Sequence, residues 1–307
     1  MALDKIQMDL LEQVADLHGI PQGAYNIRAN SEKAGRNTTE NINIVTKSDV
    51  DGIDVIIRPG TKNESVHIPV IIDQTGIKEM VYNDFIVGED CDVTIVAGCG
   101  IHNAGDRTSQ HDGIHRFFVG KNSKVKYIEK HYGEGDGNGE RVMNPTTVVE
   151  LAENSYMEME TVQIKGIDST NRKTTATVAA GATLIIGEKI YTHGRQKATT
   201  EFIVDLNGAG SSTHVTSRSV ARDDSEQLFI SKMNGNAECN GRTECDAIVL
   251  DRGKVAAKPE VSANDPDASL VHEAAIGRIA GEQLTKLMTL GLTQREAEEQ
   301  IISGFMK

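Results

Sequence analysis

Aromatic residues are scarce in this sequence, and long apolar runs are missing. Phe, Tyr and Trp together make up 4% of the 307 residues, and none of them is Trp. No apolar run approaches the roughly 18 residues that a membrane-spanning helix needs. The N-terminus also lacks the basic stretch and apolar core of an export signal. We therefore expect a cytoplasmic protein whose core consists mainly of Val, Ile, Leu and Ala.

Positive charge is the second shortage. The chain has 32 Lys and Arg residues against 45 Asp and Glu residues, which gives a net charge of −13 at pH 7. A surface of this sign repels nucleic acid and anionic membranes, so we expect neither as a partner. The motifs GxxxxGK(S/T), HExxH and GxSxG are also missing. Their absence argues against a self-contained ATPase or hydrolase.

Cysteine occurs at only four positions, Cys91, Cys99, Cys239 and Cys245. Four thiols could form two disulfides, but a chain without an export signal is expected to keep them reduced. We therefore predict free thiols. Each of these cysteines could have a chemical role. The alternative is that it is an inert thiol in the core, because cysteine is among the most often buried residue types.

Short strand-like runs fill the chain from about residue 40 to residue 260. Examples such as "GIDVIIRPG", "DVTIVAG" and "ATLIIGEKI" contain β-branched or alternating apolar residues. Turns with small residues recur at Gly181, Gly208 and Gly235, 27 residues apart each time, and Gly120 and Asn154 stand in similar contexts. Such regular punctuation predicts a solenoid of stacked coils. A β-sandwich is the alternative that the strands alone leave open.

Amphipathic helices are predicted at both ends of the chain. Asp4 is suited to the N-cap of the first helix, and Thr293 to Glu296 forms a capping box for the last one. The apolar stripes consist of Ile6, Leu10, Leu11, Val14 and Leu17 near the N-terminus and of Ile276, Ile279, Leu284, Leu287, Leu290, Ala297, Ile301, Ile302 and Phe305 near the C-terminus. We therefore expect an N-terminal helical segment (1–40), a β core (41–262) and a C-terminal helical segment (263–307).

The segment from residue 99 to residue 115 gathers side chains that soft metal ions prefer. Cys99, His102, His111 and His115 lie within 17 positions, and thiolate and imidazole are ligands of zinc, copper and iron. Their spacing matches no compact zinc finger. His111 and His115 could share one face of a strand, although Gly113 between them also suggests a bend. A structural or surface role therefore stays open.

Two pairs nearer the C-terminus are further candidates. Cys239 and Cys245 are six residues apart and could lie on one face of an extended segment. His272 and Glu273 are adjacent, so on a strand they would point to opposite faces. A helix cap and a solvated charge are the alternative for this pair.

Longer stretches of the sequence resemble one protein family. The tail "PDASLVHEAAIGRIAGEQLTKLMTLGLTQREAEEQIISGFMK", together with "ECDAIVLDRGKVAAKPEVSAND" and "GKNSKVKY", is similar to the SufB/SufD family, the scaffold subunits of the SUF system of iron–sulfur cluster assembly. The resemblance covers about residues 70 to 307. It implies a right-handed parallel β-helix that dimerises and holds a transient iron–sulfur cluster. It also implies that the C-terminal helices dock a separate ABC-type ATPase, SufC.

The resemblance implies a ligand set for the cluster, and it also puts that set in doubt. His272 and Glu273 match residues that the family places at the dimer interface, and Cys245 matches a cysteine common in the B type. The B-type cysteine regarded as a cluster ligand is missing, because this chain has Gly253 in its place. A homodimer could offer His272 and Glu273 twice, with Cys245 as the nearest remaining thiol; a paralogous subunit is the alternative partner.

The resemblance also implies a route for sulfur. Cys99 matches a cysteine thought to receive sulfur as a persulfide, and His111 matches a histidine that follows it, so a cysteine desulfurase or sulfur carrier is a further expected partner. His102, His115 and Cys239 are weaker candidates for ligation. The residues expected to contact the ATPase are Leu284, Leu287, Leu290, Ile301 and Phe305.

Two other functions remain to be weighed against a scaffold without catalytic turnover. A β-helix enzyme acting on polysaccharides would use paired carboxylates. That enzyme would need an export signal and aromatic platforms for sugars, and this chain offers neither. An adaptor subunit with inert Cys and His residues is the remaining alternative.

Overall fold

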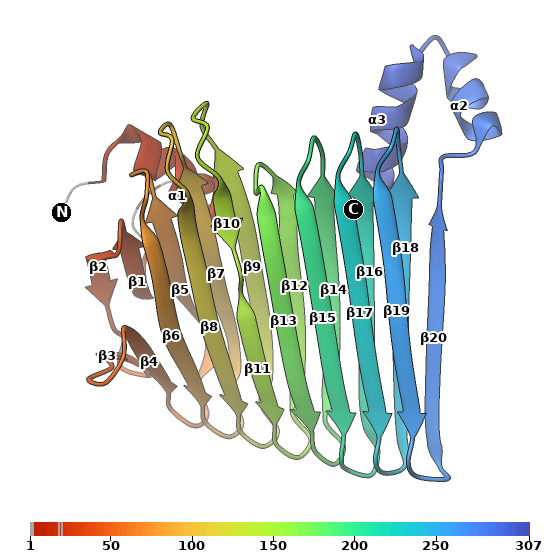
Figure 1. The fold of residues 1–307 in the computed structure, drawn as a ribbon. Helices are drawn as coiled ribbons and strands as arrows, with labels where there is room; N and C mark the ends of the chain where they lie inside the picture. The colour runs from red at the N-terminus through yellow and green to blue at the C-terminus, as the bar shows by residue number, and fades with distance from the viewer. Residues whose placement is uncertain (1–2, 18, 20) are drawn as a thin grey trace.

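The protein is a parallel β-solenoid with one helix near its N-terminus and two at its C-terminus (Figure 1). The computed structural model describes residues 3–17, 19 and 21–307. Among these residues only β1 with β2 and β3 with β4 pair antiparallel, and all other paired strands are parallel. A sandwich would consist mostly of antiparallel pairs, so the predicted solenoid is confirmed and the β-sandwich is excluded.

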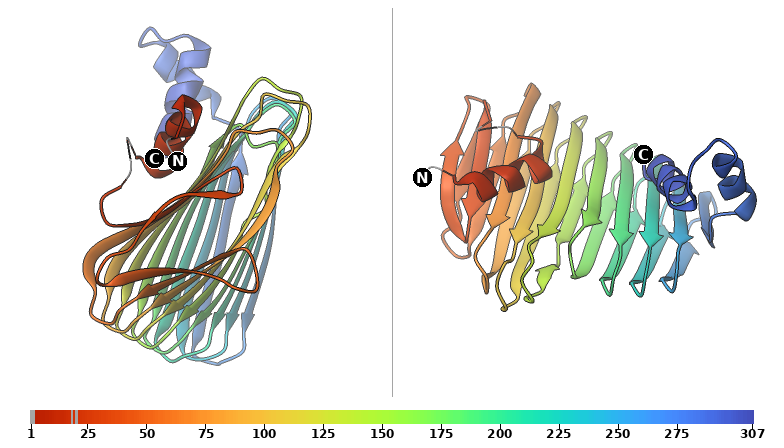
Figure 2. Two further views of the ribbon diagram at one scale, coloured as in Figure 1. Left: turned by 90° about the vertical axis from the view of Figure 1, so that its left-hand side faces the viewer. Right: turned by 90° about the horizontal axis from the view of Figure 1, so that it is seen from above.

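Two sheets face each other and form the walls of the solenoid. Sheet A has the order β2 (Glu32–Asn37), β1 (Ala24–Ala29), β5 (Lys62–Ile72), β7 (Asp92–His102), β9 (Lys124–Glu134), β12 (Tyr156–Lys165), β14 (Thr183–Thr192), β16 (Ser211–Ala221), β18 (Cys239–Val249) and β20 (Ala268–Gly277). Sheet B has the order β19 (Lys254–Ala263), β17 (Glu226–Gly235), β15 (Lys197–Leu206), β13 (Ser169–Val178), β10 (Arg141–Met143), β8 (Ser109–Val119), β6 (Lys78–Val87), β4 (Gly52–Ile57) and β3 (Ile42–Thr46), with β11 (Thr146–Leu151) also between β8 and β13. Seen along the axis, each coil is a flattened loop (Figure 2).

The turns at one edge of the solenoid stack on one another. Each places one residue in the left-handed region of backbone conformation, which Gly, Asn and Asp tolerate best: Asp90, Asn122, Asn154, Gly181 and Gly210. Bonded side chains in neighbouring coils are 32 residues apart at Asn122 and Asp90 and 29 apart at Asn236 and Asn207. The predicted punctuation is therefore a real repeat, although its interval of 27 is shorter than these coils.

Helix α1 (Lys5–Ala15) covers the outer face of sheet A at the N-terminal end of the solenoid. It begins at Asp4 with a capping box, as expected, and it buries Leu10 and Val14. A Cβ on Gly98 would lie 2.6 Å from the Val14 carbonyl oxygen, so glycine permits the close approach of α1 to β7. The predicted helical stripe ends early, because Leu17 lies beyond the helix.

The strands extend beyond both ends of the expected β core. β1 and β2 lie within the segment expected to be helical up to residue 40, of which residues 1–2, 18 and 20 are outside the described part of the chain. At the other end, Ile276 belongs to strand β20 and not to a helix. Its neighbours fit either spacing, and the free edge of β18 supplies the backbone hydrogen bonds that decide for a strand.

Two short helices follow β20. Helix α2 spans Gly281–Met288 and helix α3 spans Gln294–Phe305, the latter with the predicted Thr293 capping box. They lie above the last coils, at the same edge of the solenoid as α1 but at its opposite end (Figures 1 and 2). None of the helices in the described part of the chain has the length and apolar character to span a membrane.

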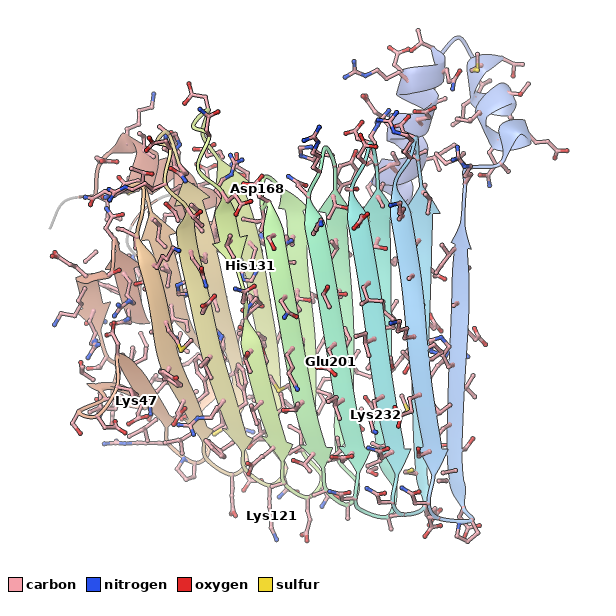
Figure 3. The ribbon with its side chains drawn as sticks, viewed as in Figure 1. Lys47, Lys121, His131, Asp168, Glu201 and Lys232 are labelled. Carbon is pink, nitrogen blue, oxygen red and sulfur yellow. The ribbon has the colours of Figure 1, made fainter. Side chains whose placement is uncertain are left out.

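The interior is packed by inward side chains of both sheets. Val, Ile, Leu, Phe and Met residues alternate with outward polar residues along each strand, as in Thr183–Thr192, where every second residue is buried. All four cysteines are unpaired and buried, which confirms the expectation of free thiols. Towards the upper part of the coils, around His131 in Figure 3, the apolar interior gives way to polar side chains.

Candidate functional site

A cluster of charged side chains lies inside the solenoid, between the two sheets. Glu129 on β9, Arg172 on β13 and Glu188 on β14 are each 2% exposed. The Arg172 guanidinium donates to a Glu129 oxygen, and its Nε lies 3.7 Å from Glu188 Oε1. Burial of a charge is costly unless a partner of opposite sign is close by. Arg172 therefore holds together two carboxyl groups that lie two coils apart, with β12 between their strands.

Histidines extend this cluster towards the N-terminal coils. His131 Nδ1 accepts from Arg172 at 3.2 Å, and His115 Nδ1 contacts the Tyr127 hydroxyl at 2.7 Å. Tyr127 donates in turn to Glu129 Oε1 at 2.9 Å. We call the whole cluster, which extends from β6 to β16, the polar network. Its members are Glu79, His111, His115, Tyr127, Glu129, His131, Arg172, Glu188 and Ser217.

Burial and charge together set the protonation of the polar network. Burial lowers the pKa of His115 to about 4 and that of His131 to about 3, so both rings are neutral at pH 7. Burial by itself would raise the pKa of Glu129, but Arg172 and the two histidines hold that pKa well below its usual value. The pKa of Glu188 is raised, chiefly by burial. Glu129 and Arg172 therefore form an ion pair.

Cys99 lies at one end of the polar network. It is on β7 and pairs in register with His131 of β9, so the two side chains are neighbours on the inner face of sheet A. Burial, followed by the charges of Glu79 and Glu129, raises the pKa of the Cys99 thiol well above its usual value. Cys99 is therefore a protonated thiol at neutral pH, in contact with polar groups on one side.

Cys245 lies at the other end of the polar network. It pairs in register with Ser217, whose hydroxyl donates to Glu188 Oε2 at 2.8 Å. Burial, then Glu188 and Asp246, raises the pKa of the Cys245 thiol to about 12. The polar network thus runs through the interior from the region of Cys99 to the region of Cys245.

Unsatisfied polar atoms line the path between the two thiols. Thr161 Oγ1 and Gln163 Oε1 point inward from β12, and neither has a hydrogen-bond partner among the described residues. Gln163 pairs in register with His131, and Thr161 with Glu129. Buried polar atoms of this kind are ordinarily satisfied by ordered water. The arrangement is suited to a hydrated path along the solenoid axis.

His272 and Cys245 lie on the same inner face at the end of the solenoid. His272 on β20 pairs with Thr243, and Cys245 pairs with Ala274, so the two are diagonal neighbours on adjacent strands. Both ring nitrogens of His272 are buried and have no hydrogen-bond partner among the described residues. Burial lowers the His272 pKa. The ring is therefore available as a neutral ligand.

Glu273 points to the opposite face of sheet A. Its carboxylate accepts a hydrogen bond of 2.8 Å from Arg242 on the outside of the solenoid. Adjacent residues of a strand alternate between faces, as expected for this pair. The structure thus brings together two of the three expected ligands and separates Glu273 from them by the backbone of β20.

The last coil is open on one side. β20 and β19 end the two sheets, and in the described part of the chain neither has a further strand beside it. Val271 and Ile276 on β20 are 42% and 41% exposed, and Val261 on β19 is 46% exposed. We call the surface of β19 and β20 that faces away from the other coils the open end. His272 and Cys245 lie just inside it.

Other predicted residues lie apart from both thiols or have an evident structural role. His102 ends β7 and pairs with Glu134 at 3.3 Å, outside the polar network. Cys239 shares the inner face with Cys245, as expected, but lies in the apolar core six residues away along β18. A Cβ on Gly253 would lie 2.5 Å from the Ala221 carbonyl oxygen. A cysteine at position 253 would therefore require the turn to shift.

The residues expected to dock a partner divide into two groups. Phe305 packs with Val220 and Leu250 of the solenoid itself, so part of the α3 stripe covers its own chain. Leu290, just after α2, is 76% exposed. Leu284, Leu287 and Ile301 are half-buried.

Sequence reasoning missed the charged centre of the polar network. In the sequence alone, the charged residues Glu129, Arg172 and Glu188 are expected on the surface of their strands. One signal was available: in "KVKYIEKHY" the residues Tyr127 and Glu129 alternate with Lys126 and Lys130, so a carboxylate and a tyrosine share one face with Val125. The alternation identifies a common face and leaves open which face is inside.

Comparison with known proteins gives one consistent result. Residues 72–305 match the family model described as the SufBD core domain of SUF system FeS cluster assembly. An iron-sulfur cluster assembly SufBD family protein of Archaeoglobus fulgidus is 30% identical over 264 residues, which cover 84% of this chain and 69% of that protein. A second, from Methanocaldococcus jannaschii, is 28% identical over 255 residues, 82% of this chain and 79% of that protein.

Longer relatives also match in part. An iron-sulfur cluster assembly SufBD family protein of Methanothermobacter thermautotrophicus is 26% identical over 248 residues, which cover 77% of this chain and 57% of that protein. The family match over residues 72–305 includes both the polar network and the open end. On the extent of the family match, this chain belongs to the SufBD family of the SUF system of iron–sulfur cluster assembly.

Proposed function

We propose that this protein is a scaffold on which an iron–sulfur cluster is assembled as cargo, and that it performs no catalytic turnover of its own. The observation that carries the proposal is the pair of His272 and Cys245 on one inner face at the open end. Both His272 nitrogens are buried without a partner among the described residues. Imidazole and thiolate are ligands that iron accepts in clusters, so the donors fit this cargo.

The placement of these donors favours release of the cluster. A cluster held by four thiolates is bound tightly, whereas mixed ligation by sulfur and nitrogen weakens and exposes it. The raised pKa of Cys245 adds a further cost, because its thiol must lose a proton before it binds iron. A scaffold must pass its cluster on, so weak ligation near an open surface suits this role.

A second subunit completes the open end in this proposal. Exposed apolar residues and the free edge of a sheet together favour pairing with another chain. A second copy of this chain would offer another His272 and Cys245, and a paralogous subunit would offer its own ligands. Glu273, on the outer face, would reach the cluster only if the edge strand turned on pairing. We therefore rank it below the other two.

An ABC-type ATPase, similar to SufC, docks on the C-terminal helices in this proposal. Leu290 and the half-buried Leu284, Leu287 and Ile301 form its contact surface, whereas Phe305 anchors α3 to the solenoid. Leu290→Glu should therefore abolish co-purification with the ATPase and leave the thermal unfolding midpoint unchanged. Unchanged capture of the ATPase by this variant would refute the docking surface.

Reconstitution tests the cluster site. Anaerobic incubation with ferrous iron and sulfide should give cluster absorbance in the wild-type protein, and a Cys245→Ala, His272→Ala double variant should lose it. Cys239→Ala, the matched removal of a buried thiol on the same strand, should keep it. Equal absorbance in the double variant and the wild type would instead favour an adaptor without a cluster. Gel filtration of the same samples reports whether a dimer forms.

Sulfur enters at Cys99 in this proposal, and the polar network leads from there towards Cys245. A Cys99→Ser variant should therefore lose cluster formation when sulfur is offered as a persulfide and keep it when sulfur is offered as free sulfide. Equal loss with both sulfur sources would make Cys99 a structural residue.

A further inference from the structure

Two imidazole nitrogens converge on one empty position in the interior. His111 and His115 on β8 flank Gly113, and all three face inward. A Cβ on Gly113 would lie 3.1 Å from His111 Nε2 and 3.4 Å from His115 Nε2. The two rings therefore lean towards each other over the space that a side chain would fill. The sequence suggested a bend at Gly113, but β8 continues through this residue. Gly113 instead makes room for the two rings.

The hydrogen bonds of the opposite ring nitrogens leave both Nε2 atoms as acceptors. Glu79 is held as a carboxylate by His111 and Arg28, so His111 Nδ1 donates to it at 2.9 Å. The Tyr127 hydroxyl donates its hydrogen to Glu129, so its oxygen accepts the hydrogen bond from His115 Nδ1. With Nδ1 as the donor in each ring, the remaining lone pair lies on Nε2. Two acceptors aimed at one position call for a shared hydrogen donor.

Cys99 completes the same cavity from the opposite sheet. The cavity has a volume of about 10 Å³, room for the centre of one atom of the size of a water oxygen, and its lining includes Cys99, His111, Gly113, His115, Glu129 and His131. This volume leaves room for one further atom beside the Cys99 side chain.

We propose that this cavity binds the outer sulfur of a persulfide on Cys99, with the S–H hydrogen shared by His111 Nε2 and His115 Nε2. The inference rests on the proposed entry of sulfur at Cys99 and adds the site that stabilises the product. Cluster assembly consumes sulfur atom by atom, and the cavity accommodates a single atom. The persulfide hydrogen supplies one donor to both imidazole acceptors.

The transfer balances without an added oxidant. The donor is a cysteine persulfide, R–S–S–H. A bond forms between Cys99 Sγ and the outer sulfur of the donor while the S–S bond of the donor breaks. The departing thiolate, R–S⁻, takes up the proton that leaves Cys99. The products are Cys99–S–S–H and R–S–H, so the outer sulfur changes partner and keeps its oxidation state.

The cavity is enclosed except where the wall of sheet B is interrupted beside it, so only a small sulfur donor is suited to reach Cys99. The interruption lies between the end of β10 at Met143 and the start of β11 at Thr146. Pro145, which lines the cavity, has no N–H to bridge the gap. Free L-cysteine persulfide is therefore used as the donor in place of a protein.

Peptide mass mapping after incubation with L-cysteine persulfide and alkylation measures the site. We expect the mass increase of one sulfur on Cys99 of the wild-type protein, in preference to Cys91, Cys239 and Cys245. Gly113→Ala places a methyl group between the two Nε2 atoms and should lower the persulfide fraction on Cys99 about tenfold, the equivalent of one lost hydrogen bond.

Gly187→Ala is the matched control. Its Cβ would meet nothing closer than 3.9 Å, so this strand glycine should be replaced without effect on the persulfide. Circular dichroism establishes that both variants are folded. An unchanged persulfide fraction in Gly113→Ala, or equal labelling of the four cysteines in the wild type, would overturn the proposal. Should Gly113→Ala not fold, the wild-type distribution among the four cysteines decides.

The same variants separate this inference from the scaffold function. Reconstitution with free sulfide needs no persulfide, so Gly113→Ala should still assemble a cluster from iron and sulfide. A wild-type protein that forms a cluster but carries no sulfur on Cys99 would refute the persulfide site alone. A wild-type protein that carries the persulfide but forms no cluster would refute the scaffold alone.

Discussion

The middle of the solenoid and its open end bury polar side chains in different ways. In the middle, Glu129, Arg172 and Glu188 are enclosed by coils on both sides, and Arg172 forms ion pairs with both carboxyl groups. At the open end, His272 is covered on one side by β18 and its ring nitrogens have no partner among the described residues. Glu129, Glu188 and His272 occupy inward positions of sheet A, and Arg172 reaches the two glutamates from sheet B.

The difference is caused by the presence or absence of a next coil. A middle strand such as β14 has neighbours on both sides, β12 and β16, whereas β20 is paired with β18 alone in the described part of the chain. An enclosed polar group must find its partner within the chain or in ordered water, because a larger molecule cannot reach it. A polar group in the last coil can instead take its partner from a ligand or a second subunit.

The largest expected effect is on the enclosed ion pairs. Arg172→Met leaves Glu129 and Glu188 buried without their cation, so we expect a loss of about 3–5 kcal/mol in the free energy of unfolding. Urea denaturation followed by circular dichroism measures it. Lys232→Met, which removes a cation from the exposed pair with Glu260, should leave the unfolding midpoint unchanged. Equal losses in both variants would contradict an enclosed middle.

Acid should weaken the middle more than the end. The pKa of His115 is lowered by burial from 6.5 to about 4. The unfolded chain thus binds this proton at higher pH than the folded chain, so the stability contribution is complete above pH 6.5 and is lost as the pH falls towards 4. The loss from His115 is about 3 kcal/mol. His131, lowered to about 3, acts in the same direction.

Urea midpoints between pH 7 and pH 4 measure this slope. His115→Gln should flatten it, whereas His272→Gln should change it less, because His272 is only half-buried. The same slope in wild type and His115→Gln would show that this histidine takes up its proton without cost.

The smallest expected effect is that of Leu270→Ala, which is compared with a matched substitution in the middle. Leu184→Ala, in the middle, leaves a cavity in a fully buried position and should cost about 2–5 kcal/mol. Leu270→Ala, in the last coil, removes a half-buried side chain and should cost about 1 kcal/mol. Urea denaturation at two protein concentrations measures both. A Leu270→Ala loss that grows with concentration would show that a second chain covers the open end.

The β-solenoid could be predicted because each coil repeats the same local chemistry. The residues that must adopt a left-handed turn are Gly, Asn or Asp, and Gly181 and Asn154 lie at such turns. The alternation of apolar residues along strands such as Thr183–Thr192 reveals the buried face. Capping boxes at Asp4 and Thr293 fix the helix starts, since they involve only residues three apart.

The ends of the core could not be predicted in the same way. The residues around Ile276 are spaced for a helix and for a strand, and only the neighbouring edge of β18 decides between them. Likewise, Glu129 and Lys130 are both charged residues in the sequence. Only the closure of the coil places Glu129 inside and Lys130 outside.

The sequence by itself determined the stacked coils, the free thiols and the family, because these depend on local patterns and on motifs that are continuous in the chain. Only the tertiary structure decided which side chains meet. His111 and Glu79 are 32 residues apart and touch because neighbouring coils bring them into register, whereas Arg172 and Glu129 are 43 apart and meet across the interior from opposite sheets. The separation of Glu273 from His272 has the same origin, since pairing with β18 fixed the face of each residue on β20.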